Sequence, residues 1–421
     1  MISPQQTLRR IAWRLMPFLF ALYIFAYLDR VNVGYAALAI QRELHFSNTV
    51  YGTGAGLFFL SYALFEVPSN MVLLRVGPRR WISLLMVVWG AISCMMPLVH
   101  TPAAFYTLRF LLGAAEAGFF PGIVLYLTYW FPQAQRARAI AGFMSAATLS
   151  GVVGAPFSAV LLRLDGVFGV SGWKWLFVGE GLPSILFGAI AFFVLLDSPA
   201  AAAWLPADER EWLLATLAAE NLHPGRRSHL RDAFRNSVIW QLAFIYFAIS
   251  AGLYSLSMWL PVLLKRISHG SDLRVVTLTA VPYIFAAIAM LAIARSSDLR
   301  QERRRHLAAA LVFATLAFAL SGLFTQHVIA TILLFVAVIS IWGCLGPFWA
   351  VPTSILQGDA AAGGIALINS VGALGGFCGP YLMGIVSDRT HSFYGALLVS
   401  AGLLLMAAVV AVRLPADACS S

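Results

Sequence analysis

Apolar segments long enough to cross a lipid bilayer alternate with short polar loops along the whole chain. A membrane-spanning helix needs about 20 consecutive apolar residues, whereas strands of a membrane barrel alternate in polarity over about ten residues. Twelve segments meet the helical criterion: 15–39, 51–74, 80–98, 103–130, 139–162, 175–196, 238–264, 275–294, 306–324, 327–355, 364–386 and 394–412. The pattern predicts an all-α membrane protein with twelve transmembrane helices.

The longest polar stretch separates the first six of these segments from the last six. It predicts an N-terminal six-helix half at 1–196, a cytoplasmic linker at 197–237 and a C-terminal six-helix half at 238–421. An apolar stripe with helical spacing runs through the linker and consists of Trp204, Leu205, Trp212, Leu213 and Leu217. Such a stripe is typical of an amphipathic helix on a membrane surface. We expect this helix to act as a connection rather than as a partner-binding site.

Two motifs repeat at one common offset along the chain. The glycine-rich motif GVVGAP (151–156) matches GGFCGP (375–380), and the arginine pair 79–80 matches the pair 303–304. Both matches fall in equivalent segments of the two halves, so they indicate a duplication. Two parallel six-helix halves related by a pseudo-twofold axis are the architecture of the major facilitator fold.

Composition and charge exclude most other classes of protein. Hydrophobic residues make up 60% of the 421 residues and charged residues 11%, with a mean hydropathy of +0.82. A soluble chain has about 25% charged residues. The net charge of +10 comes from arginines in alternate loops, and these loops are predicted to lie on the same side of the membrane as both termini. This is the positive-inside pattern, so we expect both termini in the cytoplasm and no nucleic-acid partner.

Four charged residues interrupt apolar segments: Asp29, Arg30, Arg109 and Glu116. A charge at the bilayer centre costs about 2.5–3.5 kcal/mol on insertion scales, so we expect a use for them. Arg109 and Glu116 share a helix face about 10 Å apart, while neighbours such as Asp29 and Arg30 point about 100° apart. If the first and fourth helices adjoin, all four can line one aqueous cavity. The alternative is a pair of salt bridges that only lock these helices together.

The chemistry of these residues favours an anion and a proton. The planar guanidinium of arginine binds a carboxylate through two parallel hydrogen bonds. The apolar neighbours of Glu116 disfavour its ionised form, so it can take up a proton, whereas Asp29 beside Arg30 stays ionised more easily. Asp29 and Glu116 are therefore a candidate proton-coupling pair.

Further polar and aromatic residues in the apolar segments are candidates for the cavity wall. Glu66, one turn from Tyr62, either lines the cavity or lies near the inner end of its helix. The repeat places Tyr254 opposite Arg30, and a lone amide in a glycine-rich helix favours a role for Asn369. Packing is the alternative reading for the remaining candidates, which are Ser257, Trp259, Phe348, Trp349 and Ser370. The cysteines and histidines show no metal-ligand spacing, so we expect no metal and no cofactor.

Several stretches of the chain resemble the anion:cation symporter family of the major facilitator superfamily, and in particular its bacterial tartrate and organic-acid permeases. These stretches are YLDRVNVGYAAL, FFLSYALFEVPSN, RFLLGAAEAGFFPGIVLYLTYWFP, GWKWLFVGEGLP and INSVGALGGFCGP. The resemblance implies proton-driven uptake of an organic anion. It implies substrate contacts at Tyr27, Arg30, Tyr62 and Asn369, and proton coupling at Asp29 and Glu116 with Arg109 as partner.

Together the residues and the resemblance predict a monomeric symporter in the bacterial inner membrane. We expect it to import an organic-acid or sugar-acid anion with protons by alternating access within the lipid bilayer. The rival within transport is a proton-driven exporter of drugs or metabolites, against which two membrane arginines argue. A membrane-embedded enzyme or a sensor is a rival of another class. Neither an HExxH nor a GxSxG motif occurs, and the largest loop is too short for an output domain.

Overall fold

The computed structural model describes residues 3–221, 236–268, 270–300, 302–324, 326–355 and 359–414. Over these residues the chain is helical, with no strand, and twelve helices are long and apolar enough to span a membrane. The prediction of twelve spans is confirmed. The helices extend beyond the predicted segments, since α1 has 41 residues and is therefore about 60 Å long, twice the thickness of the hydrocarbon layer.

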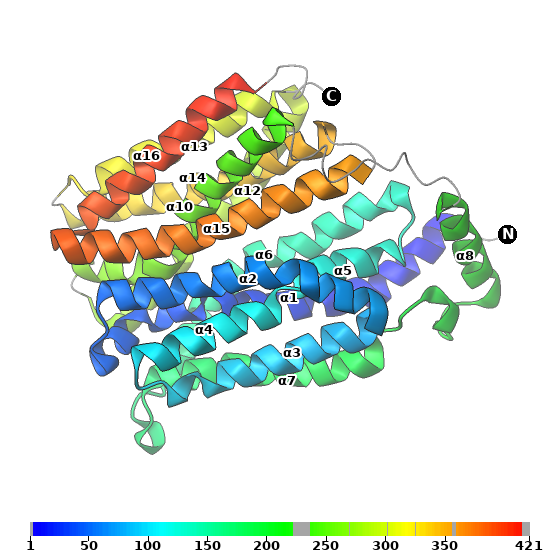
Figure 1. Ribbon diagram of the computed structural model, residues 1–421, viewed down its shortest axis with the longest axis horizontal. Coiled ribbons are helices and arrows are strands. Elements are labelled where there is room, and N and C mark those ends of the chain that lie inside the picture. The colour runs from blue at the N-terminus through cyan, green and yellow to red at the C-terminus, as the bar shows by residue number, and fades with distance from the viewer. Residues whose placement is uncertain are drawn as a thin grey trace.

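The helices follow one another with short connections (Figure 1). The N-terminal half contains α1 (Pro4–Leu44), α2 (Asn48–Val76), α3 (Pro78–Met95), α4 (Pro102–Glu116), α5 (Phe119–Thr128), α6 (Gln133–Leu162) and α7 (Gly172–Val194). The C-terminal half contains α10 (Ser237–Ser268), α11 (Asp272–Leu278), α12 (Ala280–Arg300), α13 (Arg303–Ser321), α14 (His327–Ile355), α15 (Asp359–Thr390) and α16 (Phe393–Arg413). Short 3-10 turns lie at Met96–Leu98, Val167–Gly169 and Pro199–Ala201.

Two of the twelve spans consist of two helices each, and a proline explains each break. The fourth span opens after Glu116, where α4 ends and α5 begins three residues later. Pro121 has no amide hydrogen for the carbonyl of residue 117, so the helical ladder is interrupted there. Pro282 has the same effect on residue 278, the last residue of α11. The sequence pattern predicted both spans as continuous.

The start of α1, the end of α16 and the linker helix α8 (Ala207–Asn221) lie at the same end of the bundle, which we call the terminal face (Figure 1). The opposite end, with the α1–α2 and α15–α16 connections, is the distal face. The linker contains the helix α8, which begins at Ala207, so Trp204 and Leu205 of the predicted stripe precede it. Residues 222–235 lie outside the described part of the chain. Polar contacts attach α8 to the bundle: Arg10 binds Glu209, and the Gln133 amide donates to Glu220.

The two halves pack against each other mainly through α2 with α15 and α1 with α10. Glycines bring the backbones together at this seam, because there is no space for a side chain. A Cβ on Gly384 would collide with the carbonyl oxygen of Asn48, and one on Gly34 with that of Ser257. The helix ends add polar contacts, in which the backbone amides of Asn48 and Thr49 donate to Asp388 at 3.2 and 2.7 Å.

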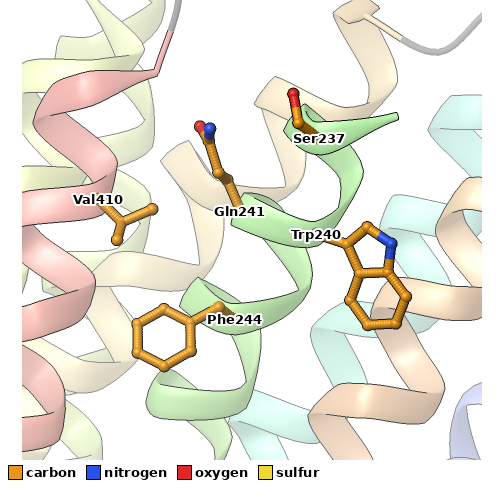
Figure 2. A pocket seen from close by; sticks show the side chains of 5 residues that line it. All are labelled: Ser237, Trp240, Gln241, Phe244 and Val410. Carbon is orange, nitrogen blue, oxygen red and sulfur yellow. The ribbon is translucent and has the colours of Figure 1, made fainter. Parts of the chain in front are cut away.

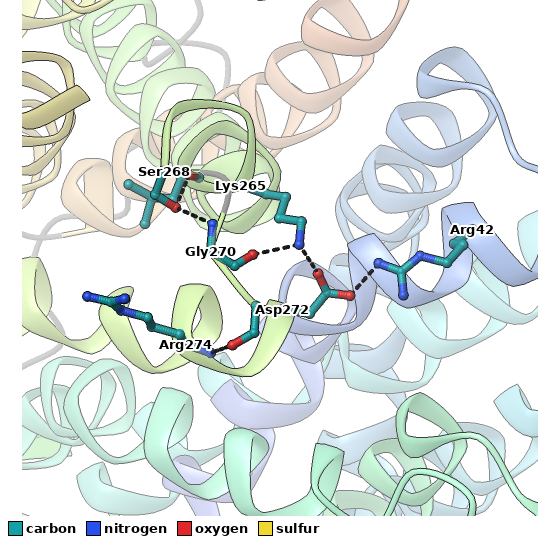
Figure 3. A network of polar contacts seen from close by, with 8 residues as sticks. Arg42, Lys265, Ser268, Gly270, Asp272 and Arg274 are labelled. Atoms are coloured by element: carbon teal, nitrogen blue, oxygen red, sulfur yellow. Dashed lines mark hydrogen bonds and ion pairs between the residues drawn. The ribbon is translucent and has the colours of Figure 1, made fainter. Parts of the chain in front are cut away.

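A second polar network joins the halves at the distal face (Figure 3). Asp272 at the start of α11 forms ion pairs with Arg42 of α1 and with Lys265 of α10, the latter at 2.7 Å. Lys265 also donates to the Gly270 carbonyl at 2.6 Å. These contacts and the glycine seam close the protein at its distal face.

Candidate functional site

All buried charged side chains among the described residues belong to the N-terminal half. They are Asp29, Arg30, Glu66, Arg109, Glu116 and Glu180. The C-terminal half buries hydroxyl groups and aromatic rings but no charge within its described residues. A charged ligand between the halves therefore finds its complementary charge on one side only.

Arg30 and Glu116 form the centre of the site. Arg30 Nη2 donates to Glu116 Oε2 at 3.3 Å, so α1 and α4 meet through their charged groups. The guanidinium lies 5.1 Å from the ring centre of Tyr62 and 5.5 Å from that of Phe58, at cation–π distances. Among the residues that the structure describes, Arg30 Nε and Glu116 Oε1 have no hydrogen-bond partner, so each can bind a further group.

The guanidinium of Arg109 also lies against the Phe58 ring, 5.0 Å from its centre. It is fully buried and donates to the carbonyl oxygens of Gly54 and Ala55, each at 3.4 Å. No ion pair joins Arg109 to Glu116 within the described residues. Arg109 and Arg30 therefore both approach the same ring, that of Phe58.

Asp29 does not join the other three charged residues, because its side chain points into the N-terminal half. Its Oδ1 accepts a hydrogen bond from Ser93 of α3 at 2.8 Å, and its Oδ2 accepts one from Ser184 of α7 at 2.6 Å. Neighbouring side chains on a helix point about 100° apart, so Arg30 and Asp29 lie in different surroundings.

The break between α4 and α5 places Glu116 at the last position of a helix. Gly118 allows the close approach of α2 here, since a Cβ would collide with the Ser69 hydroxyl. Interrupted helices recur at the binding sites of transporters, where they free backbone groups in the membrane. The carboxyl group thus lies at a point where the backbone can change shape.

Glu66 forms a contact between the two halves. Asn369 of α15 donates from Nδ2 to Glu66 Oε1 at 2.9 Å, while Oε2 has no hydrogen-bond partner within the described part of the chain. This is a direct side-chain hydrogen bond between the halves, and whether Glu66 also lines the cavity stays a prediction. The adjacent Ser370 is half-buried, and no contact joins it to these residues within the described part of the chain.

Aromatic rings cover the site from the C-terminal half. Tyr254 lies with its ring centre 4.0 Å from Phe59, and Tyr27 faces Trp342 at 6.3 Å. Phe348 and Trp349 surround Tyr246, with ring centres 5.0 and 4.9 Å away.

Two other candidates belong to the seam between the halves. Ser257 donates to the Leu253 carbonyl at 2.9 Å and accepts from Tyr283 at 3.5 Å. Trp259 is fully buried, donates to the Pro380 carbonyl and packs edge-on against Tyr51. Trp259 therefore contributes to the distal seal rather than to the cavity wall.

Two residues at or near the site were not predicted from the sequence. Phe58, whose ring lies within 5.5 Å of the Arg30 guanidinium and within 5.0 Å of that of Arg109, cannot be distinguished from other aromatic residues in an apolar segment. Glu180 of α7 is a fully buried acid in an apolar run, and the rule that singles out Glu116 would have found it.

The surface also has a hollow away from these residues, between the start of α10 and the end of α16 (Figure 2). Its wall consists of Ser237, Trp240, Gln241, Phe244 and Val410, none of them charged. This hollow lacks the arginine–carboxylate chemistry of the central site.

Comparison with known proteins identifies the family. Residues 19–380 match the model of the Major Facilitator Superfamily. A "Putative tartrate transporter" of Agrobacterium vitis is 46% identical over 96% of this chain and 94% of its own length. A "Quinolone resistance transporter" of Acinetobacter baumannii is 36% identical over 96% of this chain and 93% of its own length.

The fold agrees with this assignment. A bacterial homologue of the human lysosomal transporter Spinster, solved in an inward-facing and occupied conformation, superimposes with a TM-score of 0.79. It shares 18% sequence identity, and the match covers 97% of this chain and 98% of that one. The chain is a twelve-helix membrane transporter that belongs to the Major Facilitator Superfamily.

Proposed function

We propose that this transporter imports an organic-acid or sugar-acid anion together with protons by alternating access. The observation that carries the proposal is the Arg30–Glu116 pair, buried between the halves beneath the Tyr62 ring. A carboxylate entering the site can replace Glu116 at the guanidinium, with Tyr27, Tyr62, Tyr254 and Asn369 as further contacts. The name of the tartrate-transporter relative supports this class of substrate.

Charge balance links the anion to a proton. Arg30 and Arg109 can offset two ionised acids, and buried charges without a partner are strongly unfavourable. If a substrate carboxylate takes the place of Glu116 at Arg30, the released Glu116 carboxylate remains unpaired in an apolar setting. Proton uptake by Glu116 removes that charge, so anion binding and proton binding favour each other.

The cycle follows from this linkage. In the state open to the outside, Glu116 and Asp29 take up protons and Arg30 binds the anion. The halves then close at the distal face, as in this structure, and the site opens to the terminal face. The higher internal pH removes the protons, and Glu116 pairs with Arg30 again.

The same proposal includes orientation and location. The start of α1, the end of α16 and several arginine-rich loops share the terminal face, and the positive-inside rule supports the proposal that this face lies in the cytoplasm of a bacterial inner membrane. The site lies within one chain, between its own halves, and a monomer is sufficient for transport.

Export is the competing function, and one relative bears the name of a quinolone resistance transporter. Import and export differ in the direction of net transport, which the movement of labelled substrate in proteoliposomes measures.

The variant Glu116→Gln tests the coupling. We expect it to retain exchange of labelled substrate between the two sides of a proteoliposome, because a neutral residue mimics protonated Glu116. Accumulation driven by a pH gradient should be lost. The matched control is Glu43→Gln, an acid at the distal end of α1 that pairs with Lys174 outside the site. Unchanged accumulation by Glu116→Gln would remove Glu116 from the coupling role.

A further inference from the structure

A second polar cluster lies inside the N-terminal half, behind the central site. Glu180 on α7 is fully buried, and Ser158 of α6 donates to its Oε1 at 2.7 Å. Its Oε2 has no hydrogen-bond partner. Within the described residues no cation pairs with this carboxyl group.

Asn32 links this acid to Asp29. Asn32 lies one turn after Asp29 on α1 and donates from Nδ2 to Asp29 Oδ1 at 3.5 Å. The same fully buried amide lies next to the Glu180 carboxyl group, and over the described ranges of the chain its Oδ1 has no hydrogen-bond partner. The cluster thus holds two unpaired oxygen atoms, Asn32 Oδ1 and Glu180 Oε2.

The ionised form of Glu180 does not fit these contacts. An ionised carboxylate only accepts hydrogen bonds, so both unpaired oxygens would remain acceptors without a donor. A buried hydrogen bond that is not made is unfavourable, and a buried charge without a partner is more unfavourable still. A proton on Glu180 Oε2 removes the charge and supplies the missing donor for the amide oxygen.

We propose that Glu180 is protonated and donates through Asn32 toward Asp29. The protonated acid fixes the Asn32 amide with its nitrogen directed at Asp29, where the Ser93 and Ser184 hydroxyls also donate. Glu180 is therefore a positioning residue for the ionised form of Asp29, the second acid of the coupling pair. This inference rests on the proposed function for the role of Asp29, although the protonation of Glu180 can be tested without it.

The titratable groups around the cluster come from several helices. Asp29 and Tyr35 face it from α1 and Cys94 from α3, and Glu116 of α4 interacts electrostatically with Asp29. Arg109 of α4 interacts electrostatically with Asp29 and offsets its charge. The α6 helix contributes the Ser158 hydroxyl, which donates to Glu180. The hydrogen bonds and charges of these groups are compatible with a single negative charge in the cluster, which lies on Asp29.

Two substitutions of Glu180 separate the proposal from a purely structural role. Glu180→Gln keeps one acceptor and one donor, so we expect the uptake rate and its pH profile to match the wild type within about twofold. Glu180→Leu keeps the volume but frees the Asn32 amide, so Asp29 loses a donor and takes up its proton more readily. The external pH at which uptake falls to half should therefore move to a higher value. Asn32→Leu removes the same donor directly and should shift the profile in the same direction.

Infrared spectroscopy of the reconstituted protein tests the protonation directly. At a pH where exposed acids are ionised, we expect a carbonyl band of a neutral carboxylic acid that is present in the wild type and absent from Glu180→Gln. Wild-type and variant spectra without this difference would overturn the protonation of Glu180. A Glu180→Gln profile displaced as far as that of Asp29→Asn would also overturn it.

The positioning role has its own contrary result. Monodisperse elution and retained substrate exchange would show that the Glu180→Leu and Asn32→Leu proteins are folded. If both folded variants kept the wild-type pH profile, the positioning role of Glu180 would be refuted. If Glu180→Leu does not fold, Asn32→Leu alone decides the question. A wild type that moves no protons with any substrate would instead refute the proposed function, while the infrared result would stand.

Discussion

At the scale of single residues, Arg30 is the group that we propose selects the ligand. Its side chain is 11% exposed, pairs with Glu116 and lies against two rings, so much of its hydration has been replaced by protein contacts. Among the described residues its Nε has no hydrogen-bond partner, which leaves room for a second hydrogen bond to a carboxylate. Under the proposed function the site selects anions, and it recognises them by geometry as well as by charge.

Replacing Arg30 should reveal both contributions. A hydrogen bond to a charged group contributes about 1.5–3 kcal/mol, so Arg30→Ala should weaken substrate binding by more than about tenfold. Arg30→Lys keeps the charge without the fork and should retain part of the affinity. Equilibrium binding of labelled substrate to purified protein measures both. Wild-type affinity in Arg30→Ala would exclude Arg30 from the site.

Much of the residue-level site could be predicted from the sequence, because a charge in an apolar segment is conspicuous. Arg30, Arg109 and Glu116 were found this way, and their helices do adjoin. The surroundings of the Asp29 side chain could not be predicted. The sequence shows that Asp29 and Arg30 point about 100° apart on α1, but not which helices lie on each side. Ser93 and Ser184, which donate hydrogen bonds to Asp29, cannot be distinguished in the sequence from other serines in apolar segments.

At the scale of helices, the halves are joined by contacts that belong to helix ends. Asp388 near the end of α15 accepts hydrogen bonds from the first two amides of α2, whose own cap is Ser47. These amides carry the partial positive charge of the helix N-terminus, so an acid there is stabilising. The capping group comes from the other half, and the bond exists only while the distal face is closed.

Asp388→Ala should therefore favour the state open at the distal face. Loss of a capping residue costs about 1 kcal/mol, which shifts a two-state equilibrium about fivefold. A cysteine at Phe59, behind the seal in a cysteine-free protein, should react correspondingly faster with a membrane-impermeant reagent added at that face. The neighbouring Arg389 is exposed, and Arg389→Ala serves as control. Equal labelling rates would show that the cap does not stabilise closure.

The twelve spans themselves were predictable, since length and hydropathy are sufficient for a helix in lipid. The break after Glu116 was not predicted, although Pro121 and Gly118 supply a reason for it. A proline in a membrane helix is often tolerated without a break, as Pro17 in α1 and Pro68 in α2 show. The outcome depends on whether neighbouring groups satisfy the freed carbonyl, which is a tertiary property.

At the scale of the whole molecule, the two halves are unequal partners. The N-terminal half holds the buried charges, while the C-terminal half contributes rings, hydroxyls and the Asn369 amide. If one half moves as a rigid body against the other, the seam between them must close without burying polar groups that lack partners. The glycines of α1, α2 and α15 provide such a seam at the distal face.

Gly384→Ala should disturb this closure selectively. Its Cβ would collide with the Asn48 carbonyl of the other half, and overpacking of this kind costs about 1–3 kcal/mol. The cost falls on the closed state alone, so transport should slow while the distal face becomes more accessible to thiol reagents. Gly402 on α16 has no atom within 4 Å of an added Cβ, which makes Gly402→Ala the matched control. Identical rates for the two variants would contradict the role of the seam.

Substrate-induced proton movement is the most direct test of the whole account. Proteoliposomes with a trapped or external pH indicator would receive tartrate, sugar acids and aromatic acids in turn, followed by lipophilic cations. We predict external alkalinisation with one class of organic acid, its loss in Arg30→Ala, and no response to the cations. A folded protein that stays silent to every acid but moves protons in exchange for lipophilic cations would contradict import and establish export.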